Sequence, residues 1–288
     1  MAIVVCQNQL GFLKKTSSRL LWCGLTYSKS REGYRLCIPA TVEDAYREKR
    51  RPCRVRGELI ERLDEVNNFR RGFALQFVND VEDRTHILPW LLGTKIDLNR
   101  SKRRVFLDLG SNTFASSIQW FIQMYPCDFT EIHAFERRLD LLRIPSGFSE
   151  KDNWVAENPA ARRTKARPGI PAWILKRIKV YNQFVADKDD LDTSSINITR
   201  FIKEELNLTA EDTVIVKMDI EDSEWPILER WLNDVEMVQI IDEIFVEVHY
   251  NHKSMFNYNW NKFTHQRHQA KRLLADLRWK GYYVHFWP

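Results

Sequence analysis

From residue 101 onward, short apolar runs alternate with segments of helical character, and this alternation restricts the fold more than any other feature. The runs that we expect to form strands cover residues 104–109, 130–136, 178–186, 213–220, 240–250 and 282–287. The segments that we expect to form helices cover residues 115–125, 193–206, 223–232 and 264–279. Strands that alternate with helices build a parallel, doubly wound sheet. We therefore predict a doubly wound, mostly parallel α/β domain over residues 101–288.

Residues 1–100 have a different, mixed pattern. Within the segment 57–77, apolar residues recur at near-helical spacing, which predicts an amphipathic helix. These residues are Leu59, Ile60, Leu63, Val66 and Phe69. We expect residues 1–100 to form an N-terminal, mainly helical extension or cap.

The composition indicates a protein without a membrane span. No run of about eighteen apolar residues occurs, so we expect no spanning helix. The amino terminus lacks the basic lead and long apolar stretch of a secretory signal. The chain has five cysteines, an odd number, and none of them forms a C-x-x-C pair. Such cysteines are typical of reduced thiols, so we expect a cytoplasmic protein.

Positive charge is concentrated in two segments, although the formal net charge is only +5. One segment is residues 47–56, and the other is residues 158–186, which contain no acidic residue. A solvated surface is the simpler interpretation. The alternative is a surface for phosphate, nucleic acid or an acidic membrane. An RNA partner or an anionic substrate therefore stays an open alternative.

Acidic side chains lie where the expected strands end. Asp108 and Glu136 close the first two strands, and Asp219 and Glu221 close the fourth. In doubly wound sheets, ligands bind beyond the carboxyl ends of the strands. An uncompensated buried carboxylate is costly, so such acids gather where water or a cationic ligand meets them. We expect these four carboxylates to border a ligand site.

A glycine turn follows the first expected strand. Gly110 permits a tight turn and a close approach to a ligand, and the next helix offers free N–H groups. The turn is not G-x-G-x-x-G, and an ordinary strand-to-helix turn explains it equally well by itself. Glu136, at the end of the next strand, is the type of acid that binds ribose hydroxyls. An acidic pocket disfavours a pyrophosphate and tolerates a sulfonium, which favours S-adenosyl-L-methionine over NAD.

Four segments together resemble the motifs of the FkbM-type methyltransferases. KMDIEDSEWPIL resembles their K-x-D-x-E-G-x-E motif, and VFLDLGSNTF resembles their first motif. IHAFE resembles their ribose-binding strand, and FVEVHYN resembles their fifth strand. The resemblance covers roughly residues 101–288 and is nearest to a divergent plant-type branch. It implies a Rossmann-like class I methyltransferase fold that binds S-adenosyl-L-methionine.

The resemblance also implies roles for individual residues. Those implied for the cofactor are Asp108, Gly110, Ser111 and Asn112 at the methionine end, Glu136 at the ribose, Ala186 and Asp187 beside the adenine, and Asp219 at the amine or the acceptor. Glu221 and Glu224 would shape the acceptor side. The catalytic candidates are Asp219, His249 and Glu221, and the expected reaction is methylation of a hydroxyl acceptor.

Two residues depart from the family pattern. Phe114 stands where many members have a second glycine, and its ring would crowd the methionine moiety. Asp222 replaces the glycine of the fourth motif, which would strain the turn or add charge. Only one strand is expected after residue 250, so the usual terminal hairpin is incomplete. A non-catalytic binding module, or an RNA-directed methyltransferase that uses the basic segments, therefore remains an alternative.

Five of the seven histidines lie late in the chain: His249, His252, His265, His268 and His285. Their spacing matches no strong metal motif, so we expect no metal site. His249 ends the fifth expected strand beside the expected pocket. It is a candidate general base for a hydroxyl acceptor, and a structural histidine bonded to backbone is the equal alternative.

Overall fold

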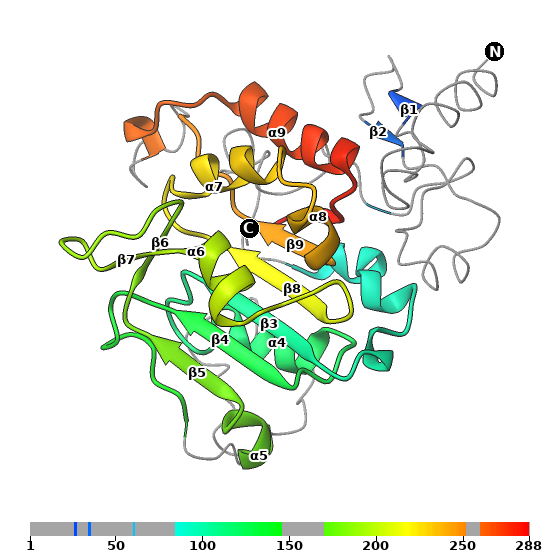
Figure 1. The fold of residues 1–288 in the computed structure, drawn as a ribbon, viewed down its shortest axis with the longest axis vertical. Helices are drawn as coiled ribbons and strands as arrows, with labels where there is room; N and C mark the ends of the chain where they lie inside the picture. Colours follow the sequence, from blue (N-terminus) through cyan, green and yellow to red (C-terminus); the bar gives the residue numbers. More distant parts are fainter. Residues whose placement is uncertain are drawn as a thin grey trace.

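Six parallel strands of the described residues form one sheet at the centre of this computed structural model (Figure 1). The structure describes residues 26–27, 34–35, 60, 84–145, 170–251 and 260–287. The strands are β3 (Arg104–Leu109), β4 (Glu131–Phe135), β5 (Ile178–Tyr181), β8 (Thr213–Met218), β9 (Glu243–Val246) and β10 (Val284–Phe286). They lie in the order β10-β9-β8-β3-β4-β5, and every neighbouring pair is parallel. The predicted doubly wound, Rossmann-like α/β sheet is confirmed.

The strand order reverses between β3 and β8, at the centre of the sheet. The chain runs outward from β3 through β4 to β5, then returns to β8 and runs outward through β9 to β10. Asp108 of β3 lies opposite Lys217 of β8 in this register. In sheets of this kind a crevice forms beyond the carboxyl ends of the strands where the order reverses.

Helices cover both faces of the sheet. They are α4 (Ile118–Met124), α5 (Ala172–Leu175), α6 (Ile198–Arg200), the π-helix η6 (Phe201–Glu205), α7 (Glu224–Trp231), α8 (Met237–Ile240), the 3-10 helix η8 (Trp260–Lys262) and α9 (Arg267–Lys280). Successive strand residues alternate between two apolar clusters. Val105 and Leu107 pack with α7 and α9, whereas Phe106 packs with α4 on the other face. Burial on both faces explains why the strands read as nearly continuous apolar runs.

The described part of the N-terminal segment consists of short 3-10 helices and one small strand pair. The 3-10 helices are η1 (Thr85–Trp90), η2 (Leu92–Thr94) and η3 (Leu98–Arg100), and the antiparallel pair is β1 (Thr26–Tyr27) with β2 (Tyr34–Arg35). The backbone N–H of Leu92 donates to Glu243 Oε1 of β9 at 2.9 Å. This contact fixes the segment to the sheet. The helix predicted over 57–77 lies outside the described residues except for Ile60, and the domain boundary at residue 100 stays a prediction.

The expected strand over residues 178–186 is two strands. β5 ends at Tyr181, and β6 (Phe184–Ala186) leaves the main sheet and pairs in parallel with β7 (Ser195–Asn197). The expected helix over 193–206 therefore starts with a strand. Its first helical residue is Ile198, because the Asn197 side chain caps the helix by accepting from the Arg200 N–H.

The end of the chain is also simpler than the resemblance implies. The expected strand over 240–250 is shortened to β9, since α8 occupies residues 237–240. β10 is parallel to β9. Within the described residues no antiparallel strand joins the main sheet, so a terminal hairpin is missing from this part of the chain.

Candidate functional site

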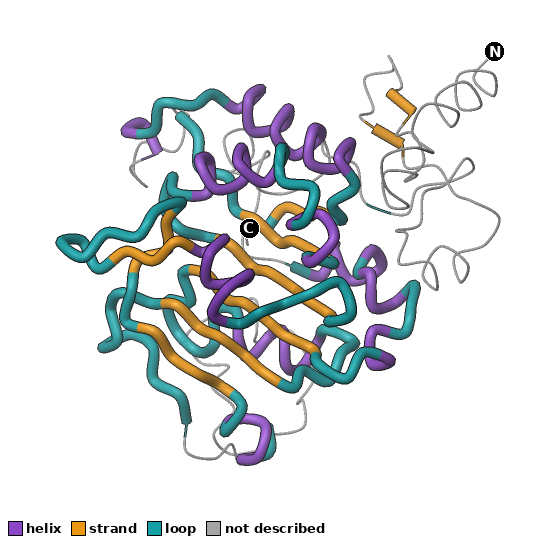
Figure 2. The backbone as a smooth tube through the Cα atoms, viewed as in Figure 1, coloured by secondary structure: helices purple, strands orange, loops and turns teal. Residues whose placement is uncertain are grey.

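A pocket opens at the carboxyl ends of β3, β4 and β8, where the strand order reverses. Its volume is about 160 Å³. The lining residues are Gly110, Phe135, Glu136, Arg137, Gln183, Phe184, Val185, Asp219, Ile220, Glu221 and Ser223. In Figure 2 the loops that follow these strands gather on the side of the sheet where β6 and β7 lie. Of the residues predicted for the cofactor, Gly110, Glu136 and Asp219 meet here, together with the predicted acceptor-side residue Glu221.

Gly110 holds the ends of β3 and β8 close together. Its φ is +77°, and a Cβ atom added to it would lie 1.9 Å from the carbonyl oxygen of Asp219. The Lys217 Nζ donates to the Gly110 carbonyl oxygen at 2.5 Å. Only glycine accommodates both the conformation and the contact.

Asp108 and Ser111 lie beneath the pocket and do not line it. Both residues are fully buried. Ser117 Oγ donates to Asp108 Oδ2 at 2.6 Å, and Ser111 Oγ donates to the Asp108 carbonyl oxygen at 3.1 Å. Their position makes them supports of the glycine turn. The direct contact with a cofactor that the resemblance implies for them stays a prediction.

Lys217 is a buried cation that the sequence analysis gave no role. Its Nζ lies 3.5 Å from Asp108 Oδ1 and 3.5 Å from Asp219 Oδ2. It therefore links the acids at the ends of β3 and β8 and compensates part of their charge. The available signal was a lone lysine inside the apolar run 214–218, where an unpaired cation would be costly.

Glu136 is held in place by backbone donors. Its Oε2 accepts from the Asn112 N–H at 2.8 Å, and its Oε1 accepts from the Arg138 N–H at 2.7 Å. Asn112 adopts a φ of 53°, a conformation that asparagine tolerates better than most residues. Each carboxylate oxygen keeps a second lone pair, so Glu136 has capacity for two hydroxyl donors.

The predicted adenine residues lie just outside the pocket. Ala186 ends β6, and the Asp187 carbonyl oxygen accepts from Arg230 Nη1 at 2.9 Å. The lining comes instead from the preceding residues, among them Phe184. Phe184 is 51% exposed, and the Arg137 guanidinium lies 5.6 Å from the centroid of its ring. An exposed aromatic face at a pocket mouth is suited to stacking against a flat ring.

The turn after β8 is strained and organised by a buried acid. Glu221 has a φ of 53° and Asp222 a φ of 90°. The expectation that Asp222 strains this turn is confirmed, because non-glycine residues rarely adopt such angles. Glu224 is fully buried, and its Oε2 accepts from the Asp222 N–H at 2.9 Å.

His249 is locked by the same acid. Glu224 Oε1 accepts from the His249 backbone N–H at 2.7 Å and lies 2.9 Å from Nδ1. The other ring nitrogen, Nε2, lies 3.9 Å from Asp219 Oδ1 and 3.9 Å from Glu221 Oε2. Burial alone would lower the pKa of His249, but the hydrogen bond to Glu224 and the charges of Glu224, Glu247 and Asp219 raise this pKa to about 10. His249 is 2% exposed and does not line the pocket, so it stands behind Asp219.

Asp219, Glu247 and His249 form a group that the sequence analysis did not anticipate. One ligand atom of each lies within 4.8 Å of the other two. Glu247 is buried, and the FVEVHYN pattern by itself assigns no role to this residue. Residues that follow adjacent parallel strands meet at one sheet edge, and the adjacency of β8 and β9 was not fixed by sequence.

Phe114 does not crowd the pocket. The residue is 6% exposed and belongs to the apolar cluster that contains Ile118 and Phe121. It is not among the lining residues. The Phe114 side chain thus packs in the core and does not narrow this pocket, and its effect on a methionine moiety stays a prediction.

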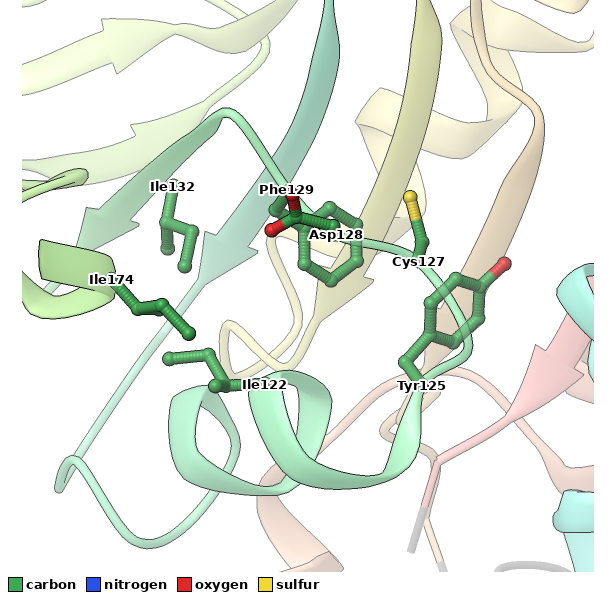
Figure 3. A pocket seen from close by; sticks show the side chains of 7 residues that line it. All are labelled: Ile122, Tyr125, Cys127, Asp128, Phe129, Ile132 and Ile174. Carbon is green, nitrogen blue, oxygen red and sulfur yellow. The ribbon is translucent and has the colours of Figure 1, made fainter. Parts of the chain in front are cut away.

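A second pocket, of about 230 Å³, lies at the opposite end of the sheet (Figure 3). It is lined by Ile122, Tyr125, Cys127, Asp128, Phe129, Ile132 and Ile174. Burial raises the pKa of the Cys127 thiol to about 12, so this thiol stays protonated and unreactive. The rest of the lining is mainly apolar, and the Asp128 carboxylate pairs with Arg177 at 2.6 Å.

Comparison of the chain with family models, with curated proteins and with solved structures finds no match. The fold and the pocket define a Rossmann-like α/β protein with an acidic site at the reversal of strand order. No helix in the described residues is long and apolar enough to cross a membrane.

Proposed function

We propose that the chain is an S-adenosyl-L-methionine-dependent methyltransferase that acts on a hydroxyl oxygen. The observation that carries the proposal is the set of groups around one pocket at the strand reversal. Gly110 permits close approach, Glu136 has capacity for two hydroxyl donors, and Asp219 presents a carboxylate. These groups suit a ribose and a cationic sulfonium with an ammonium group.

The acidity of the pocket favours S-adenosyl-L-methionine over a dinucleotide. Asp219 and Glu221 line the pocket, and the chain lacks the G-x-G-x-x-G turn that cradles a pyrophosphate. A pyrophosphate would meet like charge at this site. A sulfonium would meet opposite charge, which favours S-adenosyl-L-methionine even though the sheet order is shared with dinucleotide enzymes.

The proposed reaction is an in-line displacement. The acceptor oxygen attacks the methyl carbon, the carbon–sulfur bond breaks, and the sulfur keeps the electron pair as S-adenosylhomocysteine. Asp219 takes the hydroxyl proton, since its carboxylate lines the pocket whereas His249 lies behind it. Holding the two reacting atoms at about 3 to 3.5 Å supplies most of the rate acceleration.

The pocket must widen to hold the whole cofactor. Small-molecule sites commonly measure about 300–1,000 Å³, and this pocket is smaller, at about 160 Å³. We propose that the adenine lies across Phe184 at the pocket mouth. The strained turn at Glu221 and Asp222 is the part of the wall best suited to move, because its conformation stores energy.

Thermal unfolding with three ligands tests the cofactor class. S-adenosylhomocysteine and S-adenosyl-L-methionine should raise the unfolding midpoint in a concentration-dependent way, because a ligand that binds only the folded state stabilises it by mass action. NAD should leave the midpoint unchanged. A shift with NAD alone would replace the methyltransferase proposal by a dinucleotide site.

A further inference from the structure

We propose that Asp219, Glu247 and His249 bind a divalent transition-metal ion of the Mn²⁺ type. Their ligand atoms lie within 4.8 Å of one another at the carboxyl ends of β8 and β9. This inference goes beyond the methyl transfer proposed above, with which it shares Asp219, and it is tested without any cofactor.

The orientation of His249 carries the argument. A histidine that binds a metal almost always donates its other ring N–H to a carboxylate or carbonyl group, which fixes the tautomer. Glu224, fully buried, fills this role at Nδ1, at 2.9 Å. Trp225 Nε1 donates to the His249 carbonyl oxygen at 2.7 Å and holds the backbone as well. The imidazole is thus fixed with Nε2 directed at Asp219, and a metal ion bound at Nε2 would displace the proton from this nitrogen.

The distance from Nε2 to Asp219 Oδ1 has the value expected for two ligands of one ion. It is 3.9 Å, longer than a hydrogen bond. Two ligand atoms bound at roughly 2.0 to 2.2 Å from the same metal lie about 3 to 4.4 Å apart. The third donor atom, from Glu247, lies within 4.8 Å of the other two.

The local charge also favours a cation. Asp108, Asp219 and Glu247 are joined in this region by Glu221 and Glu224, and all five residues follow or end adjacent strands. Asp108, Glu224 and Glu247 are buried, whereas Asp219 is partly exposed and Glu221 is exposed. Lys217 and Lys262 each lie within 4 Å of acids of this group. Acids gathered at one sheet edge create a negative potential that attracts a cation.

The donor set selects the kind of ion. Two carboxylates suit Mg²⁺, Ca²⁺ and Mn²⁺, whereas an imidazole suits Fe, Ni, Cu and Zn ions. A mixed set of two carboxylates and one imidazole therefore favours Mn²⁺ over Mg²⁺ and Ca²⁺. Three protein donors leave coordination positions for water or for an oxygen-bearing ligand in the adjoining pocket, which Asp219 also lines.

Mn²⁺ titration followed by electron paramagnetic resonance tests the site in the full chain without any cofactor. The signal of the free aqua ion falls as Mn²⁺ binds to the protein. This loss of signal should fit one saturable site per chain. Glu247→Gln should weaken Mn²⁺ binding at least tenfold, because it alters a ligand. Glu224→Gln should weaken this binding by about 10- to 100-fold, because the change releases the His249 imidazole from its fixed orientation. Circular dichroism of each variant checks that it is folded.

Asp222→Asn is the matched control. It removes one charge from the same turn, and asparagine tolerates the positive φ of 90° there. Its affinity for Mn²⁺ should stay close to that of the unchanged chain. Equal weakening by Asp222→Asn and Glu247→Gln would show diffuse attraction of cations and would overturn the proposal.

A measurement on the unchanged chain remains decisive if a variant fails to fold. Bound Mn²⁺ broadens nuclear magnetic resonance signals of nearby groups, so it should erase the His249 imidazole signals at low occupancy. The exposed His268 on α9 should keep its signals. Equal broadening of both histidines, or of neither, would contradict the site whatever the outcome for the methyltransferase proposal.

Discussion

At the scale of single residues, close approach and burial decide which predicted side chains reach the pocket. Glu136 and Asp219 line it, whereas Asp108 lies fully buried opposite Lys217 in the neighbouring strand. The sequence predicts that all three acids end strands. It does not predict which of them a lysine on the adjacent strand neutralises, because that pairing depends on the order of the strands.

Gly110→Ala tests the contact between β3 and β8. The added Cβ would lie 1.9 Å from the Asp219 carbonyl oxygen, at a φ of +77°. We expect a loss of about 3 kcal/mol in the free energy of unfolding, since overpacking and an unfavourable φ act together. Urea unfolding measures the loss.

Gly281→Ala is the control for the Gly110 substitution. Gly281 ends α9 with a φ of 104°, so it reports the cost of the backbone conformation at a helix end. We expect this change to lower the free energy of unfolding by about 1 kcal/mol. Equal losses for the two substitutions would contradict the close approach at Gly110.

Asp222→Gly tests the strain in the acidic turn. Asp222 has a φ of 90°, and its ion pair with His265 spans 3.7 Å at partly exposed side chains. Such a pair contributes little, so relief of the backbone strain should dominate and stabilise the fold by about 1 kcal/mol. A lower unfolding midpoint for this variant would show that the turn is not strained.

At the scale of elements, the sequence predicts those strands and helices that a local pattern of residues specifies. The structure confirms the strands at 104–109, 130–136 and 213–220, to within one or two residues at each end, because their runs are apolar and bounded by turn or polar residues. The helix at 223–232 is confirmed as α7, with Pro226 in its first turn, where proline is tolerated. The break between β5 and β6 was not predictable, since β6 pairs with β7 and no glycine or proline interrupts the run.

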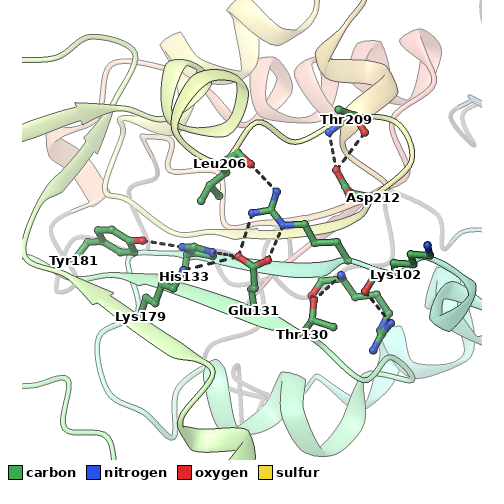
Figure 4. A network of polar contacts seen from close by, with 11 residues as sticks. Lys102, Thr130, Glu131, His133, Lys179, Tyr181, Leu206, Thr209 and Asp212 are labelled. Carbon is green, nitrogen blue, oxygen red and sulfur yellow. Dashed lines mark hydrogen bonds and ion pairs between the residues drawn. The ribbon is translucent and has the colours of Figure 1, made fainter.

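A polar network ties the amino ends of the strands to one another (Figure 4). Arg103 Nε donates to Glu131 Oε1 at 2.6 Å, and Arg103 Nη1 donates to the Leu206 carbonyl oxygen at 2.6 Å. Glu131 Oε2 lies 3.2 Å from His133 Nε2. The hydrogen bond from Arg103 is the main cause that lowers the pKa of Glu131 from 4.5 to about 2.

Glu131→Gln should therefore lower stability at neutral pH but not in acid. A carboxyl group with a lowered pKa in the folded state stabilises the fold above its unfolded pKa and loses this contribution as the pH falls. We expect a difference of about 1 to 2 kcal/mol at pH 7, since solvent screens the partly exposed pair. The difference should fade between pH 4.5 and about 2.

Denaturant unfolding across this pH range measures the effect, with Glu204→Gln as the control. Glu204 is exposed in η6, so its substitution should change stability little at any pH. A difference for Glu131→Gln that persists unchanged at pH 2 would contradict the ionic origin of the contact.

At the scale of the whole molecule, the two basic segments are the features that bear on an anionic partner. The basic segment 47–56 lies outside the described residues. In the segment 158–186, Arg177 pairs with Asp128 at 2.6 Å and lies 4.4 Å from the Trp173 ring centroid. Arg177 is therefore engaged within the fold, and an RNA partner stays a prediction.

Salt dependence tests the RNA alternative. Contacts with several phosphates release counterions, so RNA affinity should fall steeply as the salt concentration rises. Substitution of Arg50 and Arg51 by glutamine should reduce that slope if the segment 47–56 binds phosphate. Binding that is absent or insensitive to salt would remove RNA as the acceptor.

The most direct test of the central claim is calorimetric titration with S-adenosylhomocysteine. The account predicts saturable binding that Glu136→Ala weakens by more than about tenfold, since two charge-assisted hydrogen bonds are lost. Glu229→Ala, an exposed change on α7, should bind like the unchanged chain. Absence of binding at millimolar ligand by folded protein would contradict the methyltransferase account and favour a non-catalytic binding module.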